Sequence, residues 1–164
     1  YNAAVELGPQ TDALLNLGNK TTGKWGLTFD MYIPANKTAD MNLQGKVPVD
    51  LNAPEWLVGN IYFGYGTGSE KGHIGYLDAN SEPIVGGIDF DYPNDQWFKM
   101  EMNFDISTGI DTATWQFNID GVEVISAGTI LPDIPGYTSL GGVDFFARDE
   151  NIQYYVDNFC YKQL

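Results

Sequence analysis

The chain has few of the residues on which redox chemistry and most enzyme catalysis depend. Its 164 residues include one cysteine (Cys160), one histidine (His73) and one arginine (Arg148). A single cysteine excludes an internal disulfide bond. Because Cys160 lies within a strand-like pattern, we expect it to be a small buried side chain, and His73 to be a solvated residue at a strand edge.

Positive charge is also scarce. The chain has eight Lys and Arg residues and 22 Asp and Glu residues, which gives a net charge of −14 and an isoelectric point near 4.1. Such a chain repels the phosphate backbone of nucleic acids and an anionic membrane surface. Its charge suits a secreted protein that must stay soluble, or one that holds cations.

The sequence contains no hydrophobic run long enough to cross a membrane and no signal peptide. It begins abruptly at Tyr1, so we expect residues 1–164 to be a single domain excised from a larger secreted or cell-surface protein. We expect the isolated domain to be a monomer that does not insert into membranes.

Helical periodicity is absent, whereas alternation of apolar and polar residues is pervasive. It is clearest in Trp97–Asp105 and Thr112–Ile119, which are joined by the turn-like segment Ile106–Asp111. Asp120-Gly121 is a hairpin signal, and Val122–Ile125 reads as the next strand. These segments predict a three-stranded antiparallel meander. Its core-facing residues would be Phe98, Met100, Met102, Phe104, Ala113, Trp115, Phe117 and Ile119.

The rest of the chain has the same character, with apolar alternation broken at short intervals by Gly, Pro, Asn and Asp. The pattern predicts about a dozen strands and favours an all-β fold, an antiparallel two-sheet jelly-roll sandwich. The further strands expected are Asn2–Leu7, Ala13–Leu17, Lys24–Ile33, Met41–Val47, Trp56–Tyr65, His73–Asp78, Ile84–Asp91, Leu140–Arg148 and Ile152–Tyr161.

The outward side of the predicted meander is polar. Lys99, Glu101 and Asn103 alternate with the core residues of one strand, and Thr114, Gln116 and Asn118 do so in the next. We therefore expect a solvated convex sheet without an aromatic platform, and a ligand site elsewhere.

Several segments resemble concanavalin A-like, or LamG-like, jelly-roll modules of secreted and cell-surface proteins of Bacteroidetes-type bacteria. The resemblance covers nearly the whole chain and lies in structural motifs, so it implies the fold and says little about chemistry. The segments that carry it are Leu14–Pro34, Met41–Gly45, Gln96–Asp105, Trp115–Gly121, Leu140–Ala147 and Tyr154–Phe159.

Catalytic motifs of jelly-roll enzymes are missing. Laminarinase-type hydrolases carry an E-x-D-x-x-E strand, which this sequence lacks. Alginate-lyase-type jelly rolls carry a Gln-x-His strand and an arginine-rich strand, whereas this chain has one histidine and one arginine. No Gly-x-Ser-x-Gly elbow occurs. We therefore expect a protein that is not an enzyme.

A calcium site is possible on composition alone, since Ca²⁺ takes six or more oxygen ligands. Concanavalin A-like modules often carry one calcium ion, so the resemblance implies that a single structural calcium is possible. The alternative is that these carboxylates only keep the surface soluble. The candidate groups are Asp78–Glu82, then Asp89 with Asp91 and Asp95, and Asp149–Asn151 with Asp157.

Carbohydrate binding requires exposed aromatic rings beside hydrogen-bonding groups. Arg148 could pair with a sugar carboxylate or sulfate. Core packing is the alternative for each aromatic residue, and an ion pair with Asp144 or Asp149 is the alternative for Arg148. The candidate ligand-binding residues are Trp56, Asn60, Tyr62, Tyr76, Asp144 and Arg148.

The sequence thus favours a non-catalytic carbohydrate-binding module that holds a polysaccharide or glycan on the solvent face of one sheet or at its edge loops. An adhesive or structural spacer module without sugar binding is the alternative. A third hypothesis is an unrecognised polysaccharide-active enzyme.

Overall fold

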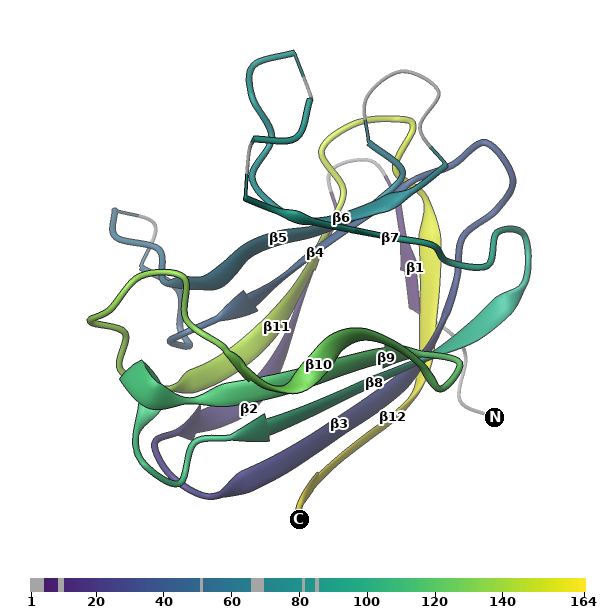
Figure 1. Ribbon diagram of the computed structural model, residues 1–164. Helices are drawn as coiled ribbons and strands as arrows, with labels where there is room; N and C mark the ends of the chain where they lie inside the picture. The colour runs from purple at the N-terminus through teal and green to yellow at the C-terminus, as the bar shows by residue number, and fades with distance from the viewer. Residues whose placement is uncertain (1–4, 9–10, 51, 66–69, 81, 85) are drawn as a thin grey trace.

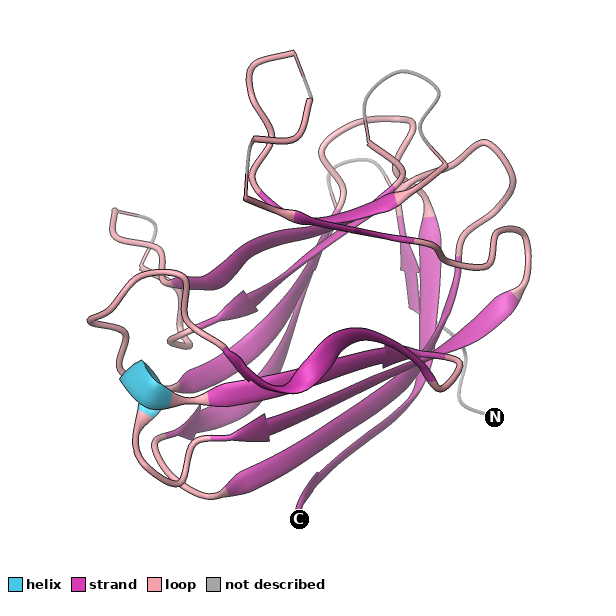
Figure 2. Cartoon of the chain, viewed as in Figure 1, coloured by secondary structure: helices cyan, strands magenta, loops and turns pink. Residues whose placement is uncertain are grey.

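Strands make up nearly all the regular structure of the protein (Figure 2). The structure, a computed structural model, describes residues 5–8, 11–50, 52–65, 70–80, 82–84 and 86–164. None of the helical structure in those ranges is long and apolar enough to span a bilayer. The elements are β1 Val5–Leu7, β2 Asp12–Lys20, β3 Lys24–Tyr32, β4 Ala39–Gln44, β5 Trp56–Phe63, β6 Gly72–Gly75, β7 Ile88–Phe90, β8 Trp97–Asp105, the 3₁₀ turn η1 Ile110–Thr112, β9 Thr114–Ile119, β10 Val122–Ile130, β11 Leu140–Phe146 and β12 Tyr154–Gln163.

The strands form two six-stranded antiparallel sheets that pack as a sandwich (Figure 1). Sheet A has the order β1-β12-β3-β8-β9-β10, and sheet B has the order β2-β11-β4-β5-β6-β7. The fold is a concanavalin A-like jelly roll, which confirms the predicted class. The predicted meander is also confirmed, since β8, β9 and β10 are consecutive neighbours in sheet A.

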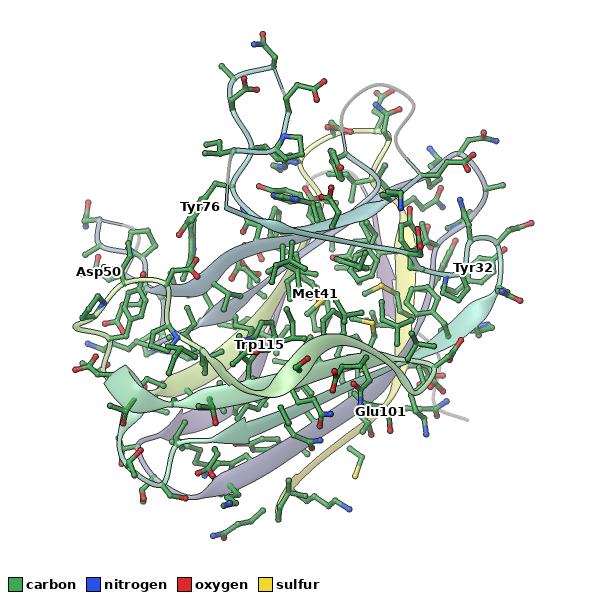
Figure 3. All side chains as sticks on the ribbon, in the orientation of Figure 1. Tyr32, Met41, Asp50, Tyr76, Glu101 and Trp115 are labelled. Carbon is green, nitrogen blue, oxygen red and sulfur yellow. The ribbon has the colours of Figure 1, made fainter. Side chains whose placement is uncertain are left out.

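The core lies between the two sheets, and Figure 3 shows Met41 of sheet B and Trp115 of sheet A pointing into it. Every residue expected to face the core from β8 and β9 is buried. Phe63 illustrates the packing, because its ring contacts the rings of Phe90, Tyr92 and Phe98. Each such side chain contributes about 1.5–3 kcal/mol when removed from water.

One hairpin is shorter than the sequence predicts. The segments expected as His73–Asp78 and Ile84–Asp91 form regular strands only over β6 and β7, and beyond them a single antiparallel bridge joins Leu77 to Pro83. Gly75 and Gly86 have positive φ angles of 141° and 108°, which end the regular strands on either side of a long loop. Of the predicted first strand, Val5–Leu7 is present as β1, and residues 1–4 lie outside the described ranges.

Strand β12 carries a bulge that makes the prediction for Cys160 wrong. Asp157 pairs with Asp30, whereas Cys160 pairs with Thr28, so one extra residue enters β12 between them. Asn158 in this bulge has a φ of 56°. The extra residue reverses the alternation of faces, because side chains alternate with a period of two. Cys160 is consequently exposed on the outer side of sheet A.

Candidate functional site

The outer side of sheet B is lined with polar residues, and its centre is β4. Met41 and Leu43 of β4 point into the core, while Asp40, Asn42 and Gln44 alternate with them and are nonetheless buried. Residues opposite one another in antiparallel strands share a face. The pairing therefore extends this side into three cross-strand rows, which we call the polar face. The rows are Asp12, Phe146, Asp40, Tyr62, His73 and Asp89; then Leu14, Asp144, Asn42, Asn60 and Gly75; then Asn16, Gly142, Gln44 and Trp56.

Arg148 and Asp40 form an ion pair at one end of the polar face. The Nε and Nη2 atoms of Arg148 lie 2.8 and 2.7 Å from Asp40 Oδ2. Asp40 is 2% exposed, whereas the Arg148 side chain is 55% exposed. Burial raises the pKa of Asp40 to about 6, against the opposing effect of the Arg148 charge. The pair thus fixes a solvent-facing guanidinium on a buried carboxylate.

Tyr62 forms the wall beside this ion pair. The Arg148 guanidinium carbon lies 5.7 Å from the centre of the Tyr62 ring, within the range of a cation–π contact. Asn60 donates a hydrogen bond from Nδ2 to the Tyr62 hydroxyl at 2.8 Å. Burial raises the pKa of Tyr62. The ring and its hydroxyl are therefore held in place from two sides.

A polar pocket of about 240 Å³ opens over these groups. Asp40 and Tyr62 contribute from sheet B, Arg148 lies two residues after β11, and Tyr65 lies two residues after β5. The loops after β6 and β11 close the remaining sides. The lining residues from the loops and strand ends are Thr38, Gly64, Leu77, Asn80, Asp149, Asn151 and Ile152. We call this the sheet B pocket.

A buried polar network extends from the pocket across the polar face. Gln44 donates a hydrogen bond to Asn42, and Asn42 donates one to Asp144 at 3.4 Å. Gln44 Oε1 and Asn60 Oδ1 are buried and have no hydrogen-bond partner among the described residues. Buried polar atoms normally have a partner. This part of the face therefore retains unused hydrogen-bonding capacity beneath the surface.

Two carboxyl groups meet in the same network. Burial raises the pKa of Asp144 to about 7, and the neighbouring Asp12 carboxylate raises it further in the same direction. Asp144 Oδ1 has no donor within the described part of the chain. A proton shared with Asp12 would satisfy this oxygen. Asp144 therefore retains its proton up to about pH 7.

His73 is not the solvated edge residue that the sequence predicts. It lies in β6 between β5 and β7, is 2% exposed, and its Nδ1 is 2.8 Å from Asp89 Oδ1. The ring is covered by Gly87, where an added Cβ would lie 2.4 Å from His73 Nε2. The prediction is wrong because β7 adds a further strand beyond β6, which moves His73 away from the sheet edge.

The structure brings only some of the predicted site residues together. Tyr62 and Arg148 line the sheet B pocket, with Asn60 behind them. Asp144 lies two strands from Asn60, in the buried network. Trp56 is at the opposite end of β5 from Tyr62.

Tyr76 lies at a different, largely apolar pocket of about 400 Å³, which is lined by isoleucines from strands of both sheets and from their loops. The ion-pair partner of Arg148 is Asp40 instead of Asp144 or Asp149.

Sequence reasoning missed Asp40, Asn42, Gln44 and Tyr65. A signal for the first three was present in the alternation Asp40-Met-Asn-Leu-Gln44, in which the polar positions hold only carboxyl and carboxamide groups. The apolar positions predict the strand, and the polar positions mark its outer face. Tyr65 carried no comparable signal.

Two of the candidate carboxylates for calcium, Asp78 and Asp149, stabilise local turns. Asp78 Oδ1 accepts hydrogen bonds from the backbone N–H groups of Asn80 and Glu82, and Asp149 Oδ1 accepts one from Asn151. Ser81, within the first candidate group, lies outside the described residues. Across the described residues, no group of three or more His, Cys, Asp or Glu side chains is placed to hold a metal ion. The calcium site stays a prediction.

No protein-family model matches the chain, and no curated protein matches it in sequence. Solved structures match it in shape. The alginate lyase AlyC3 superposes with a TM-score of 0.61 at 9% identity, over 98% of this chain and 74% of the lyase. The alginate lyase Aly36B gives 0.58 at 9% identity, over 99% and 81%.

Galectin LEC-6 of Caenorhabditis elegans gives a TM-score of 0.55 at 10% identity, over 96% of both chains. The lyases have been solved with sugars bound, Aly36B with an alginate trisaccharide and AlyC3 with dimannuronate. At these identities the likeness establishes the concanavalin A-like jelly-roll fold, which the chain shares with both lyases and galectins.

Proposed function

We propose that this domain is a non-catalytic carbohydrate-binding module and that the sheet B pocket holds a sugar ring of a neutral glycan. The observation that carries the proposal is the convergence of Arg148, Asp40, Tyr62 and Tyr65 on one open polar pocket. Guanidinium groups donate hydrogen bonds, carboxylates accept them, and a sugar hydroxyl does both. A tyrosine ring beside these groups offers an apolar surface to the C–H face of a sugar.

The charges of the pocket favour a neutral sugar over an acidic one. Asp40 already pairs with Arg148, in the position that the sequence hypothesis gave to a sugar carboxylate. Asp149 lines the same pocket, and the whole chain carries a charge of −14. A uronic acid or sulfate would bring a further negative charge to this surface. We therefore expect neutral polysaccharides to bind more tightly than alginate.

The position of His73 supports binding without turnover. A general base must lie within hydrogen-bond reach of the proton that it removes. Gly87 lies against His73 Nε2, and the residues that line the sheet B pocket include Arg148 and Tyr65 but not His73. Release of new sugar ends from any polysaccharide by the isolated domain would contradict the non-catalytic proposal.

Affinity gel electrophoresis tests the proposal directly. The domain is run through gels containing laminarin, galactomannan or xyloglucan, with alginate as the acidic comparison. We expect retardation by at least one neutral polymer. Absence of retardation in every gel, with calcium and with EDTA, would contradict the proposal and leave the adhesive or structural spacer as the remaining function. The EDTA arm also tests the calcium prediction.

Two asparagines provide a matched pair of variants. Asn80 lines the pocket, and its backbone N–H and Nδ2 contact the carboxylate of Asp78, two residues earlier. Asn52 makes the same contacts with Asp50 outside the pocket. If Asn80 contacts the sugar, Asn80→Ala removes about 1 kcal/mol of binding free energy, a roughly fivefold loss of affinity. Asn52→Ala should bind like the unchanged protein.

Because polysaccharides are found on cell surfaces and outside cells, we expect the domain to act there. We also expect it to be a monomer. Sedimentation of the purified domain at increasing concentrations tests the second expectation. A stable dimer would contradict it.

A further inference from the structure

The outer side of sheet A carries three aromatic residues in one cross-strand row. Tyr155 of β12 pairs with Tyr32 of β3, and Tyr32 pairs with Trp97 of β8. We call these residues the aromatic row. Because directly paired residues share a face, all three rings lie on the outer side of the sheet. Figure 3 shows Tyr32 at the end of the sandwich where β8 begins. The outward positions named for the meander are polar as predicted, and the aromatic row lies beside them, on β12, β3 and the first residue of β8.

The rings form one continuous surface. The ring centres of Tyr32 and Trp97 are 5.7 Å apart, and those of Tyr32 and Tyr155 are 6.0 Å apart. Trp97 is 49% exposed, which is high for the largest apolar side chain. The row was not recognisable from the sequence because its members come from strands that are far apart along the chain.

Hydrogen-bonding groups flank the row on both sides. On one side, Asp95 accepts a hydrogen bond from the Tyr32 hydroxyl at 2.7 Å, and this bond raises the pKa of Tyr32. Gln153 donates to the Tyr155 hydroxyl at 3.2 Å. On the other side, the next cross-strand row consists of Asp157, Asp30 and Lys99.

We propose that the aromatic row is a second carbohydrate site, which binds a neutral, soluble glycan chain across β12, β3 and β8. The C–H faces of sugar rings would pack on Trp97, Tyr32 and Tyr155 in succession, because the faces of aromatic rings offer flat apolar surfaces. The flanking carboxylates would accept hydrogen bonds from sugar hydroxyls. Three carboxylates against one lysine disfavour an anionic chain, so the charges select a neutral polymer.

The tilt between the rings selects the physical form of the ligand. The Tyr32 ring is tilted by 40° from Trp97 and by 51° from Tyr155. Three non-coplanar rings cannot lie flat against a crystalline surface at the same time. They fit a single chain whose successive sugar rings turn relative to one another.

The two sites face in opposite directions, because one is on the outer side of sheet A and the other on the outer side of sheet B. One short glycan cannot reach both. Two chains can be held by one molecule, so a domain with both sites should cross-link a soluble polymer into a network. The aromatic-row site does not depend on the sheet B pocket being a sugar site.

Trp97→Ala tests the proposal, with Trp97→Phe as an intermediate and Val122→Ala as the matched control. Val122 is an exposed apolar residue of the same sheet, on its edge strand β10. Affinity for laminarin, galactomannan and xyloglucan is measured by gel retardation, and cross-linking by turbidity. Trp97→Ala should lose at least tenfold in affinity at this site and should not cross-link. Trp97→Phe should lose less, and Val122→Ala should match the unchanged protein.

Tryptophan fluorescence gives an independent signal. Addition of the bound polysaccharide should shift the emission of the unchanged protein, and Trp97→Phe should remove most of that shift. Circular dichroism and thermal unfolding of each variant establish that the sandwich is intact, so that a loss of binding is not a loss of folding.

The outcomes separate this site from the sheet B pocket. Loss of binding in Trp97→Ala, with binding retained in the double variant Asn80→Ala/Arg148→Lys, supports the aromatic row even if the pocket binds no sugar. Unchanged affinity and turbidity in Trp97→Ala overturn the proposal. So does a concentration-dependent dimer that Trp97→Ala abolishes, since the row would then be a surface for a second copy. Trp97-dependent retention on microcrystalline cellulose alone would also overturn it.

Discussion

Arg148 combines a structural contact with an exposed surface. Its guanidinium pairs with the buried Asp40 and lies over the Tyr62 ring, yet more than half of the side chain is exposed. The sequence singles out this residue, because Arg148 is the only arginine of the chain. It did not identify the partner, since Asp40 is 108 residues away along the chain, whereas the carboxylates first considered lie within four residues.

We expect Arg148→Ala to lower stability as well as binding. The substitution leaves the Asp40 carboxylate buried without its cation, which costs about 1–3 kcal/mol of unfolding free energy for a pair with one exposed partner. Urea unfolding at pH 7.5 measures the loss. The double variant Asp40→Asn/Arg148→Gln removes both charges and should recover most of it. Equal stability of Arg148→Ala and the unchanged protein would show that the pair contributes nothing.

Asp144 should make stability depend on pH. Its pKa is raised in the folded protein to about 7, so the folded chain binds a proton that the unfolded chain releases near pH 4. Stability from this group is therefore complete below pH 4 and is lost as pH rises towards 7. Asp40 acts in the same direction up to about pH 6.

Asp144→Asn removes this titration. We expect the variant to be more stable than the unchanged protein at pH 8 by about 1–2 kcal/mol, after allowance for partial exposure of the side chain. The difference should shrink towards pH 4. Urea unfolding at a series of pH values measures it. An identical pH dependence in both proteins would show that Asp144 is not the titrating group.

At the scale of elements, the bulge of β12 decides which of its residues reach the two faces of sheet A. The bulge of β12 turns Cys160 outward. In β5, two extra residues enter between Asn60 and Trp56, which leaves both on one face, and Gly59 within this shift has a φ of 68°. Alternation in the sequence locates strands well, since it reflects burial on one side. It cannot locate a bulge, because the inserted residue changes the face without changing the composition.

Gly59 offers a test of the β5 bulge, with Gly128 as its control. An added Cβ at Gly59 would lie 2.6 Å from the backbone oxygen of Gly75, whereas at Gly128, with a φ of 88°, nothing lies within 4 Å. Both alanine variants carry the cost of a positive φ, about 1–2 kcal/mol. Gly59→Ala carries the clash as well, so we expect it to lose a further 1–3 kcal/mol. Thermal and urea unfolding compare the two, and equal losses would contradict the close approach.

For the whole molecule, the sequence was sufficient for the fold and insufficient for the sites. A dozen alternating segments predict two sheets packed face to face, whatever the order of the strands within each sheet. The sites can be predicted only when that strand order is known. Asp40 meets Tyr62 and Phe146 only because β4 lies between β5 and β11, and the aromatic row exists only because β3 lies between β12 and β8. These neighbours are set by chain crossings that leave no local pattern.

The charge of the whole molecule predicts how salt affects binding. A neutral polymer has no charge to be screened, so its affinity should change less than twofold between 50 and 500 mM NaCl. Alginate should bind weakly at low salt, where a charge of −14 repels it most. Gel retardation at both salt concentrations measures this. Tight alginate binding that weakens with salt would contradict the neutral ligand.

The outward turn of Cys160 has a practical use. It is the only thiol of the chain, and it lies on the outer side of sheet A, opposite Thr28, four pairing steps or about 13 Å along β3 from Tyr32, the partner of Tyr155. A maleimide dye attached there would mark one face of the sandwich and leave the other unlabelled. Its emission would report when a chain occupies the aromatic row, while the sheet B pocket is titrated separately.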